Sequence, residues 1–240
     1  MVSIDTVYQR VLTIANKEQR GYITPQEFNL LANQAQLEIF EQYFYDTSQF
    51  GRVLGNDTAH SDMLNLLEEK ISIFEVSRPD TQATLSNYAG GRFVLPPNLW
   101  RLGTVMADDI EAEYISLKEW SYIRRNPLAM PYNNNPIYYR DSRGISVWGK
   151  SSTTGSVSEI TTGVSCDFIR RPSVVNWNYT EINGTPLYNQ SNSTDFELHP
   201  SEEIRLVMKI LLLAGVTINE TALYQIASTE DKQKEQQQKL

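Results

Sequence analysis

The 240-residue chain has one cysteine, two histidines and no long apolar run. With Cys166 alone, an internal disulfide or a cysteine metal cage cannot form, so we expect a reducing compartment and a small buried thiol on a strand. The longest apolar stretch, 210–216, is far too short to span a bilayer, and the N-terminus lacks a basic region followed by an apolar run. The sequence therefore predicts a soluble protein with no membrane partner and no signal peptide.

Positive charge is also scarce. The chain carries 21 Lys and Arg against 29 Asp and Glu, for a net charge of -8 and a pI near 4.9. Binding to a phosphate backbone depends on clustered Lys and Arg that release counterions. We therefore expect no specific contact with nucleic acid.

Catalytic and cofactor motifs are missing. The sequence has no Gly-rich phosphate loop, no dinucleotide fingerprint, no His-Glu-x-x-His and no Gly-x-Ser-x-Gly. His60 lies in a polar stretch and His199 precedes a proline at a helix entry, so both suit surface or capping roles. We expect no enzyme, no catalytic residue, no cofactor and no metal site.

One acidic group is the strongest candidate for chemistry. Asp108, Asp109, Glu111 and Glu113 offer oxygen ligands for a hard cation or paired carboxylates for hydrolysis. Their spacing fits no EF-hand loop. An acidic turn between two strands is the favoured interpretation of these residues. A hydrolase that uses Asp108 or Glu111 remains an alternative function for the protein.

The most informative segment of the chain is a predicted helix over 24–45. Thr24 and Glu27 form a capping box around Pro25, which marks the helix start. At 3.6 residues per turn, two apolar stripes fall on opposite sides of this helix: Phe28, Ala32, Ala35, Ile39 and Tyr43 on one, Leu30, Leu37 and Phe44 on the other. Either both stripes are buried within one subunit, or Leu30, Leu37 and Phe44 contact a neighbouring copy.

The remaining pattern predicts an α+β fold: a helical bundle made from N- and C-terminal helices, with a β-rich small sheet or barrel inserted in the middle. The predicted domains are 1–70 (helical), 71–198 (β-rich, with one embedded helix over 117–125 capped by Ser116) and 199–240 (helices and a polar tail completing the bundle). A loop is expected over 46–61. The C-terminal helix should stop at Gly215, and Asn219 should cap a last helix.

Aromatic residues are plentiful, and their role is left open by the sequence. Trp148, Trp177 and Tyr179 could form a glycan-binding platform, so a receptor- or glycan-binding tail component is the alternative function. The same side chains are equally typical of sheets and subunit interfaces.

Several segments resemble a family of virion proteins of short-tailed bacteriophages, the head-to-tail connector, adaptor or neck-ring proteins of crAss-like phages and the related tail tubular adaptors. The segments that carry this resemblance are Ile4–Tyr8 (IDTVY), Gly21–Phe28 (GYITPQEF), Asn33–Gln36 (NQAQ), Tyr122–Leu128 (YIRRNPL), Cys166–Pro172 (CDFIRRP) and Phe196–Glu203 (FELHPSEE). They follow one another over nearly the whole chain.

The resemblance implies a non-catalytic ring of about 12 copies in the neck or tail of a virion assembled in the host cytoplasm. Its partners would be other copies of itself, the portal protein, a downstream tail or nozzle protein, and genomic DNA passing through the lumen without specific binding. The C-terminal segment would reach the portal, with candidate contacts at Asn219, Leu223, Tyr224, Ile226 and Leu240. The alternative for this polar tail is plain disorder.

Overall fold

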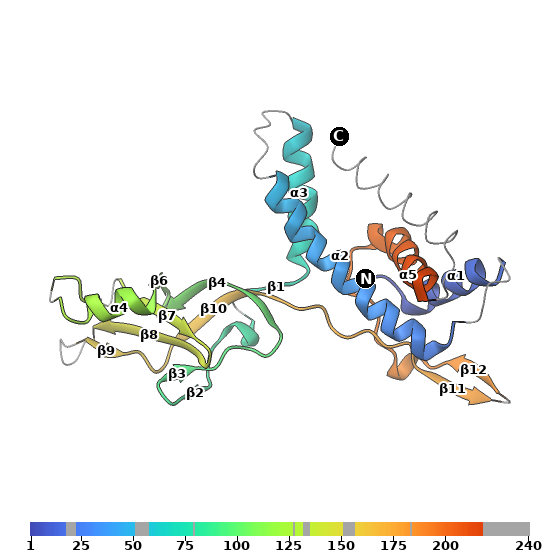
Figure 1. Ribbon diagram of the computed structural model, residues 1–240. Helices are drawn as coiled ribbons and strands as arrows, with labels where there is room; N and C mark the ends of the chain where they lie inside the picture. The colour runs from blue at the N-terminus through green and yellow to red at the C-terminus, as the bar shows by residue number, and fades with distance from the viewer. Residues whose placement is uncertain are drawn as a thin grey trace. The chain divides into compact units, whose positions relative to one another are not determined.

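The structure is a computed structural model whose chain divides into two units, shown in Figure 1. It describes residues 1–17, 23–50, 58–78, 80–126, 128–131, 135–150, 157–182 and 184–217. The helical unit contains Met1–Ile73 and the described residues from Pro172 onward, whereas the sheet unit is Phe74–Arg171. Residues 172–198, which the sequence placed with the β-rich region, thus belong to the helical unit.

The described residues of the helical unit form four α-helices, two short 3₁₀ helices and one hairpin. Their bounds are α1 Ile4–Lys17, α2 Pro25–Phe50, α3 Thr58–Ser72, β11 Tyr179–Ile182, β12 Thr185–Tyr188, η2 Gln190–Asn192, η3 Pro200–Glu202 and α5 Glu203–Thr217. Helix α2 packs against α3 and α5, and α1 packs against α5.

Helix α2 begins where the sequence predicts. The Glu27 amide donates to Thr24 Oγ1 at 3.2 Å, and the Thr24 amide donates to Glu27 Oε2 at 2.9 Å, which confirms the capping box. The first apolar stripe, Phe28 to Tyr43, is completely buried. The predicted loop over 46–61 is wrong at both ends, because α2 continues to Phe50 and α3 starts at Thr58.

A ladder of side-chain amides joins α2 to the extended segment 173–177. Asn29 Oδ1 accepts from the Trp177 amide at 2.8 Å, and Asn33 Oδ1 accepts from the Val175 amide at 2.9 Å. Asn33 Nδ2 also donates to the Val175 carbonyl at 2.9 Å, and Gln36 Nε2 donates to the Ser173 carbonyl at 2.8 Å. These positions are four and three residues apart, so one polar stripe of the helix satisfies the backbone of a strand-like segment.

This arrangement corrects the expected architecture. A bundle of N- and C-terminal helices flanking an inserted β domain is wrong: the five described helices are scattered along the chain, α4 lies among the strands, and three sheets are present. The helical unit itself contains the β11–β12 sheet and the bridge Val2↔Phe196. The physical reason is that the amide side chains of α2 form hydrogen bonds with the backbone of an extended segment. A bundle made only of helices would leave these amides without such partners. The fold is a mixed α+β fold with a β-rich core.

In the part of the sheet unit that the structure describes, there are ten strands, the 3₁₀ helix η1 and helix α4. The bounds are β1 Glu75–Val76, η1 Thr81–Ala83, β2 Tyr88–Ala89, β3 Arg92–Phe93, β4 Leu99–Ala107, β5 Ile110–Glu111, β6 Glu113–Tyr114, α4 Leu117–Ile123, β7 Ile137–Asp141, β8 Gly144–Lys150, β9 Val157–Glu159 and β10 Val164–Arg170. One sheet has the order β1-β10-β4-β5, and the other has the order β2-β3-β8-β7-β6 with β9 also on β8. Among the described strands, every pair in these two sheets is antiparallel except β6–β7.

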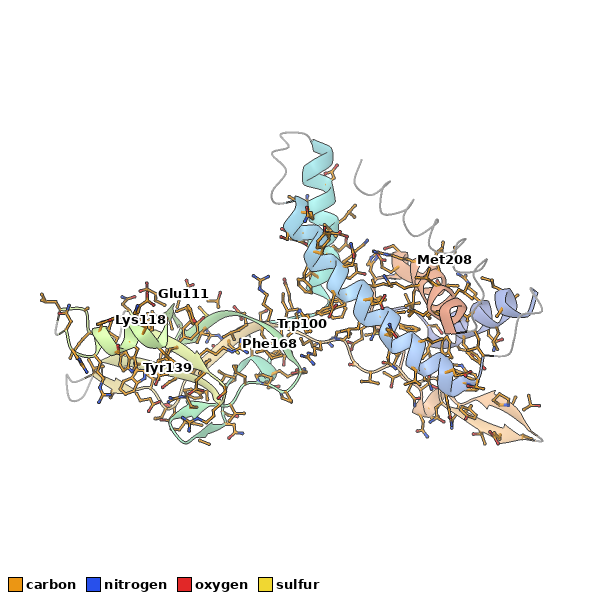
Figure 2. The ribbon with its side chains drawn as sticks, viewed as in Figure 1. Trp100, Glu111, Lys118, Tyr139, Phe168 and Met208 are labelled. Atoms are coloured by element: carbon orange, nitrogen blue, oxygen red, sulfur yellow. The ribbon has the colours of Figure 1, made fainter. Side chains whose placement is uncertain are left out.

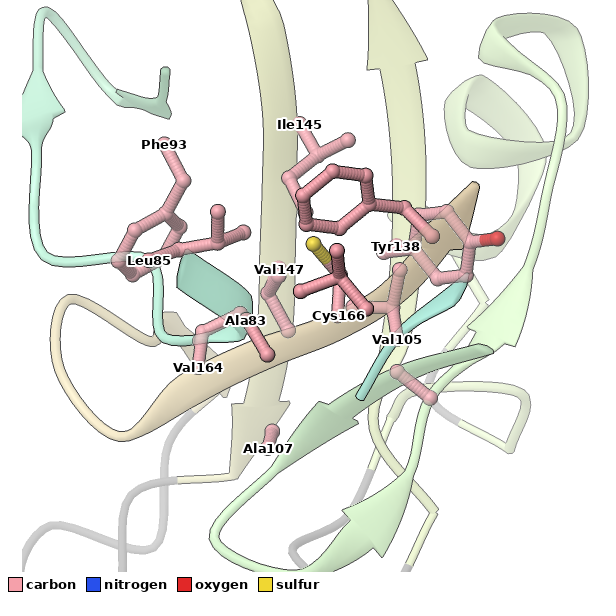
Figure 3. Packing of buried hydrophobic residues seen from close by; sticks show 13 residues of the cluster. Ala83, Leu85, Phe93, Val105, Ala107, Tyr138, Ile145, Val147, Val164 and Cys166 are labelled. Atoms are coloured by element: carbon pink, nitrogen blue, oxygen red, sulfur yellow. The ribbon is translucent and has the colours of Figure 1, made fainter. Parts of the chain in front are cut away.

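The core of this unit lies between the two sheets, as Figure 3 shows. Val105 and Cys166 come from one sheet, and Tyr138, Ile145 and Val147 come from the other. A second cluster lies on the other face of β7, where Trp120 of α4 packs with Ile115, Ile137 and Tyr139, the last of which is labelled in Figure 2. Helix α4 therefore covers the outer face of the second sheet.

Candidate functional site

The second stripe of α2 is the surface that the sequence singled out. Leu30 is 73% exposed and Leu37 is 40% exposed, so both present aliphatic surface to solvent in the isolated subunit. Phe44 differs from them: its side chain is half-buried, and its ring lies edge-to-face against Phe40 at 5.0 Å. The structure thus leaves two of the three predicted interface residues open, and their contact with another subunit stays a prediction.

Polar residues border this stripe. Gln34 Nε2 donates to Glu38 Oε1 at 3.0 Å, and Glu38 also pairs with Lys209 of α5 at 3.3 Å. Glu41, on the next turn, is exposed. Apolar anchors surrounded by polar side chains are typical of protein interfaces, although single exposed leucines also occur on ordinary surfaces.

A buried ionic cluster lies elsewhere in the helical unit. Lys70 Nζ is 2.5 Å from Glu202 Oε1, and Arg205 is 3.7 Å from the other oxygen of the same carboxylate. Burial, reinforced by the nearby Glu202 carboxylate, raises the pKa of Tyr43 well above its ordinary value. The cluster borders a hollow of about 380 Å³. Because each charge faces an opposite one, the cluster ties α3 to the start of α5.

The residues considered for chemistry have structural surroundings. His199 caps η3, with Nδ1 accepting from the Ser201 amide at 3.3 Å, which confirms its capping role; the side chain of His60 is outside the described residues. Asp108 and Asp109 form the turn between β4 and β5, with φ values of 45° and 68°, and Asp109 pairs with Arg78. Within the described residues, no three or more His, Cys, Asp or Glu side chains converge as a metal site would require.

Cys166 matches its predicted environment. It lies on β10, is 1% exposed, and burial raises the pKa of its thiol to about 12. A thiol held in this form is a poor nucleophile. Its role is to fill the core of the sheet unit.

The large aromatic side chains are used inside their own units. The Trp177 ring is 1% exposed, donates its indole N–H to Asp5 at 3.0 Å, and lies 5.7 Å from the stacked ring of Tyr179. In the sheet unit, Trp148 lies 4.6 Å from Trp120 and donates its indole N–H to Ser146. Trp177 and Trp148 are therefore engaged in packing and do not form the exposed platform that glycan binding would use.

The proposed portal contacts cannot be placed, because Asn219, Leu223, Tyr224, Ile226 and Leu240 are outside the described residues. The expected helix stop at Gly215 is wrong, since α5 continues to Thr217. Among the helices of the described segments, none has the length and apolar character needed to cross a membrane.

Sequence reasoning missed the amide ladder of α2. The sequence did contain a signal for this ladder. Asn29, Asn33 and Gln36 recur at helical spacing, which places three amide side chains on one face of the helix, next to its apolar residues. It also missed the distribution of charge. The sheet unit, 74–171, has 11 Lys and Arg against 10 Asp and Glu, which leaves 10 against 19 for the rest of the chain. The acidity of the protein is thus concentrated outside the sheet unit.

The fold and these surfaces together define a two-unit α+β protein with an exposed apolar helix stripe. A scan against protein-family models and a search of curated proteins both returned no match.

Proposed function

We propose that this chain is a structural virion protein, a head-to-tail connector or adaptor that assembles into a ring between the portal and the tail and lines the DNA exit channel. The observation that supports this most directly is the two-sided character of α2. One stripe of the helix is completely buried in the subunit, while Leu30 and Leu37 expose apolar surface elsewhere on the same helix. The resemblance of the chain to neck-ring proteins supplies the class of assembly.

Ring closure makes a specific demand on the subunit. A head-to-tail interface uses two different patches on each copy, and it closes into a ring when the rotation between copies allows it. The exposed stripe of α2 is one such patch, and its neighbouring copy would cover it with a different surface. Burying a fully exposed leucine contributes roughly 1.5–3 kcal/mol, so Leu30 approaches this range and Leu37, which its own subunit already covers in part, contributes less.

The charge distribution suits a channel for DNA. Outside the sheet unit, the chain has 19 Asp and Glu but only 10 Lys and Arg, which gives that part a negative potential. Like charge disfavours contact with phosphates, so DNA would slide past such a wall instead of binding to it. A lumen lined mostly by Lys and Arg in the assembled particle would remove this part of the proposal.

The test is a pair of charge substitutions on the exposed stripe. The double variant Leu30→Asp with Leu37→Asp should stay monomeric under conditions in which the wild-type protein assembles. It should still fold, because both side chains are already solvent-exposed in the subunit. Leu66→Asp on α3, where the leucine is 51% exposed, is the matched control and should assemble normally. Mass in solution and circular dichroism report assembly and folding separately.

If the double variant assembles as the wild-type protein does, the proposed role of the stripe is contradicted. If the aspartates prevent folding, Leu30→Gln with Leu37→Gln repeats the test without burying a charge. The glycan-binding alternative has no supporting observation among the described residues, since Trp148 and Trp177 are packed in their own units.

A further inference from the structure

Strand β6 is an edge strand created by a change of partner. After the turn at Asp108 and Asp109, the chain pairs with β4 through Ile110 and Glu111, and the Ala112 amide still donates to the Val105 carbonyl at 2.8 Å. From Glu113 onward it pairs in parallel with β7 instead. Strand β6 is therefore the last strand of its sheet, and no described strand pairs with its edge away from β7, which we call the open edge.

The divergence from β4 has a visible cause. Between Cys166 and Phe168 the register of β10 against β4 shifts, so that Gly103 and Thr104 stand opposite Asp167. A bulge of this kind bends the strand that carries the extra residue. A Cβ atom on Gly103 would lie 2.9 Å from the Asp167 carbonyl oxygen, so the close approach at the bulge favours glycine.

The open edge has backbone groups available for pairing. The Glu113 amide donates to the Pro136 carbonyl and the Ile115 amide donates to the Tyr138 carbonyl, both at 2.9 Å. Because successive residues of a strand direct their amides to opposite edges, the Tyr114 amide points away from β7. No described residue accepts a hydrogen bond from it, and the Tyr114 side chain is 60% exposed.

A hollow lies on each side of this edge strand, and both hollows are bordered by Glu113, Tyr114 and Asn135. The first, of about 490 Å³, lies between β4 and β6 and includes Glu111, a residue labelled in Figure 2. The second, of about 310 Å³, lies beside α4 and has a largely apolar lining. The aliphatic side chains of that lining are Ile115, Ile123, Ala129, Met130, Pro131 and Ile137, with the exposed ring of Tyr122 beside them.

The charged groups around both hollows have one sign. The lining contains Glu111, Glu113 and Glu119, and it contains no Lys or Arg from the described part of the chain. Glu119 is occupied by the cap of α4, but Glu111 and Glu113 form no ion pair with any described residue. A ligand that supplies cationic groups here would gain attraction without displacing an existing partner.

We propose that β6 is a strand-addition site for an extended segment of another protein in which Lys or Arg alternates with aliphatic residues. The segment pairs with the open backbone edge of β6. Its aliphatic side chains enter the hollow beside α4, and its cationic side chains enter the hollow between β4 and β6. Main-chain bonds supply affinity in this mode of recognition, and alternating pockets supply specificity. The proposal does not depend on the connector role.

The test uses a synthetic heptapeptide, blocked at both ends, in which lysine alternates with valine. Titrated into the full-length protein up to millimolar concentration, it should shift the backbone amide signals of Glu113–Ile115. Replacing its lysines with glutamates should weaken binding at least about tenfold. N-methylation of every second backbone amide leaves the side chains in place but should abolish binding, because the strand can no longer pair with β6.

Substitutions in the protein complete the test. Glu111→Gln and Glu113→Gln should each weaken the lysine peptide about two- to fivefold, as expected for exposed charge pairs. Glu68→Gln, at an exposed carboxylate on α3, is the matched control and should have no effect. Equal binding of the N-methylated or glutamate peptide, signal shifts away from β6, or no shift at millimolar peptide would each overturn the proposal.

Discussion

At the scale of single residues, the amide ladder of α2 shows how a few polar side chains position a long extended segment. Asn29, Asn33 and Gln36 bond to backbone groups about 140 residues further along the chain. A buried backbone group that loses its partner has no water to replace it. These three amides therefore stabilise the placement of 173–177 against the helix.

We expect Asn33→Ala to lower the free energy of unfolding by about 2–4 kcal/mol, because the Val175 amide and carbonyl both lose their partner. Chemical denaturation of the purified protein measures this directly. Gln34→Ala is the matched control on the next position of the same helix. It removes only an exposed bond to Glu38 and should cost less than about 0.5 kcal/mol. Equal losses for the two variants would show that the ladder is not a stabilising feature.

Cys166 gives a second prediction at this scale. The thiol is buried and its pKa is raised to about 12, so at pH 8 the folded protein should react with a thiol reagent far more slowly than the denatured protein. Since the chain has only this cysteine, the colour released by the reagent reports a single site. Rapid modification of the folded protein would contradict the packing of the sheet-unit core.

At the scale of elements, the two capping boxes illustrate what local sequence specifies. Ser116 and Glu119 form the same reciprocal pair at α4 that Thr24 and Glu27 form at α2. The hydrogen bond from the Ser116 backbone amide lowers the pKa of Glu119, and the Thr24 backbone amide does the same for Glu27. Both carboxylates are therefore more acidic in the folded protein than in the unfolded chain.

This shift predicts a pH dependence. A group whose pKa is lowered by folding stabilises the folded state above its unfolded pKa, and that contribution disappears as pH falls through the folded pKa. Glu119→Ala should thus be less stable than wild type at pH 7, and the difference should shrink below the ordinary glutamate pKa of about 4.3. Denaturation at several pH values measures the difference. A constant difference across this range would contradict the charged cap.

Local features were predictable from the sequence, whereas long-range pairing was not. The start of α2, its buried stripe and the helix capped by Ser116 follow from residues only a few positions apart. The placement of 172–198 with the helices depends on side chains of α2 that lie far away in sequence, so the expected domain division missed it. For the candidate site, periodicity placed Leu30, Leu37 and Phe44 on one stripe but left open whether the subunit itself buries them. The structure shows that Leu30 and Leu37 are exposed and that Phe44 packs on Phe40.

At the scale of the whole molecule, the proposed function depends on assembly. The acidity outside the sheet unit and the exposed stripe of α2 are features of a single subunit, and both would acquire a function in the proposed ring, where copies meet around a channel. The proposed ring would also give a reason for a helix to carry apolar residues beyond the stripe that its own subunit buries.

The decisive experiment on ring assembly is to measure the mass of the wild-type protein in solution. We expect a closed particle of twelve copies of the 27.5 kDa chain, about 330 kDa, visible as rings in averaged electron micrographs. A protein that stays at 27.5 kDa at high concentration and in the presence of portal protein would contradict it.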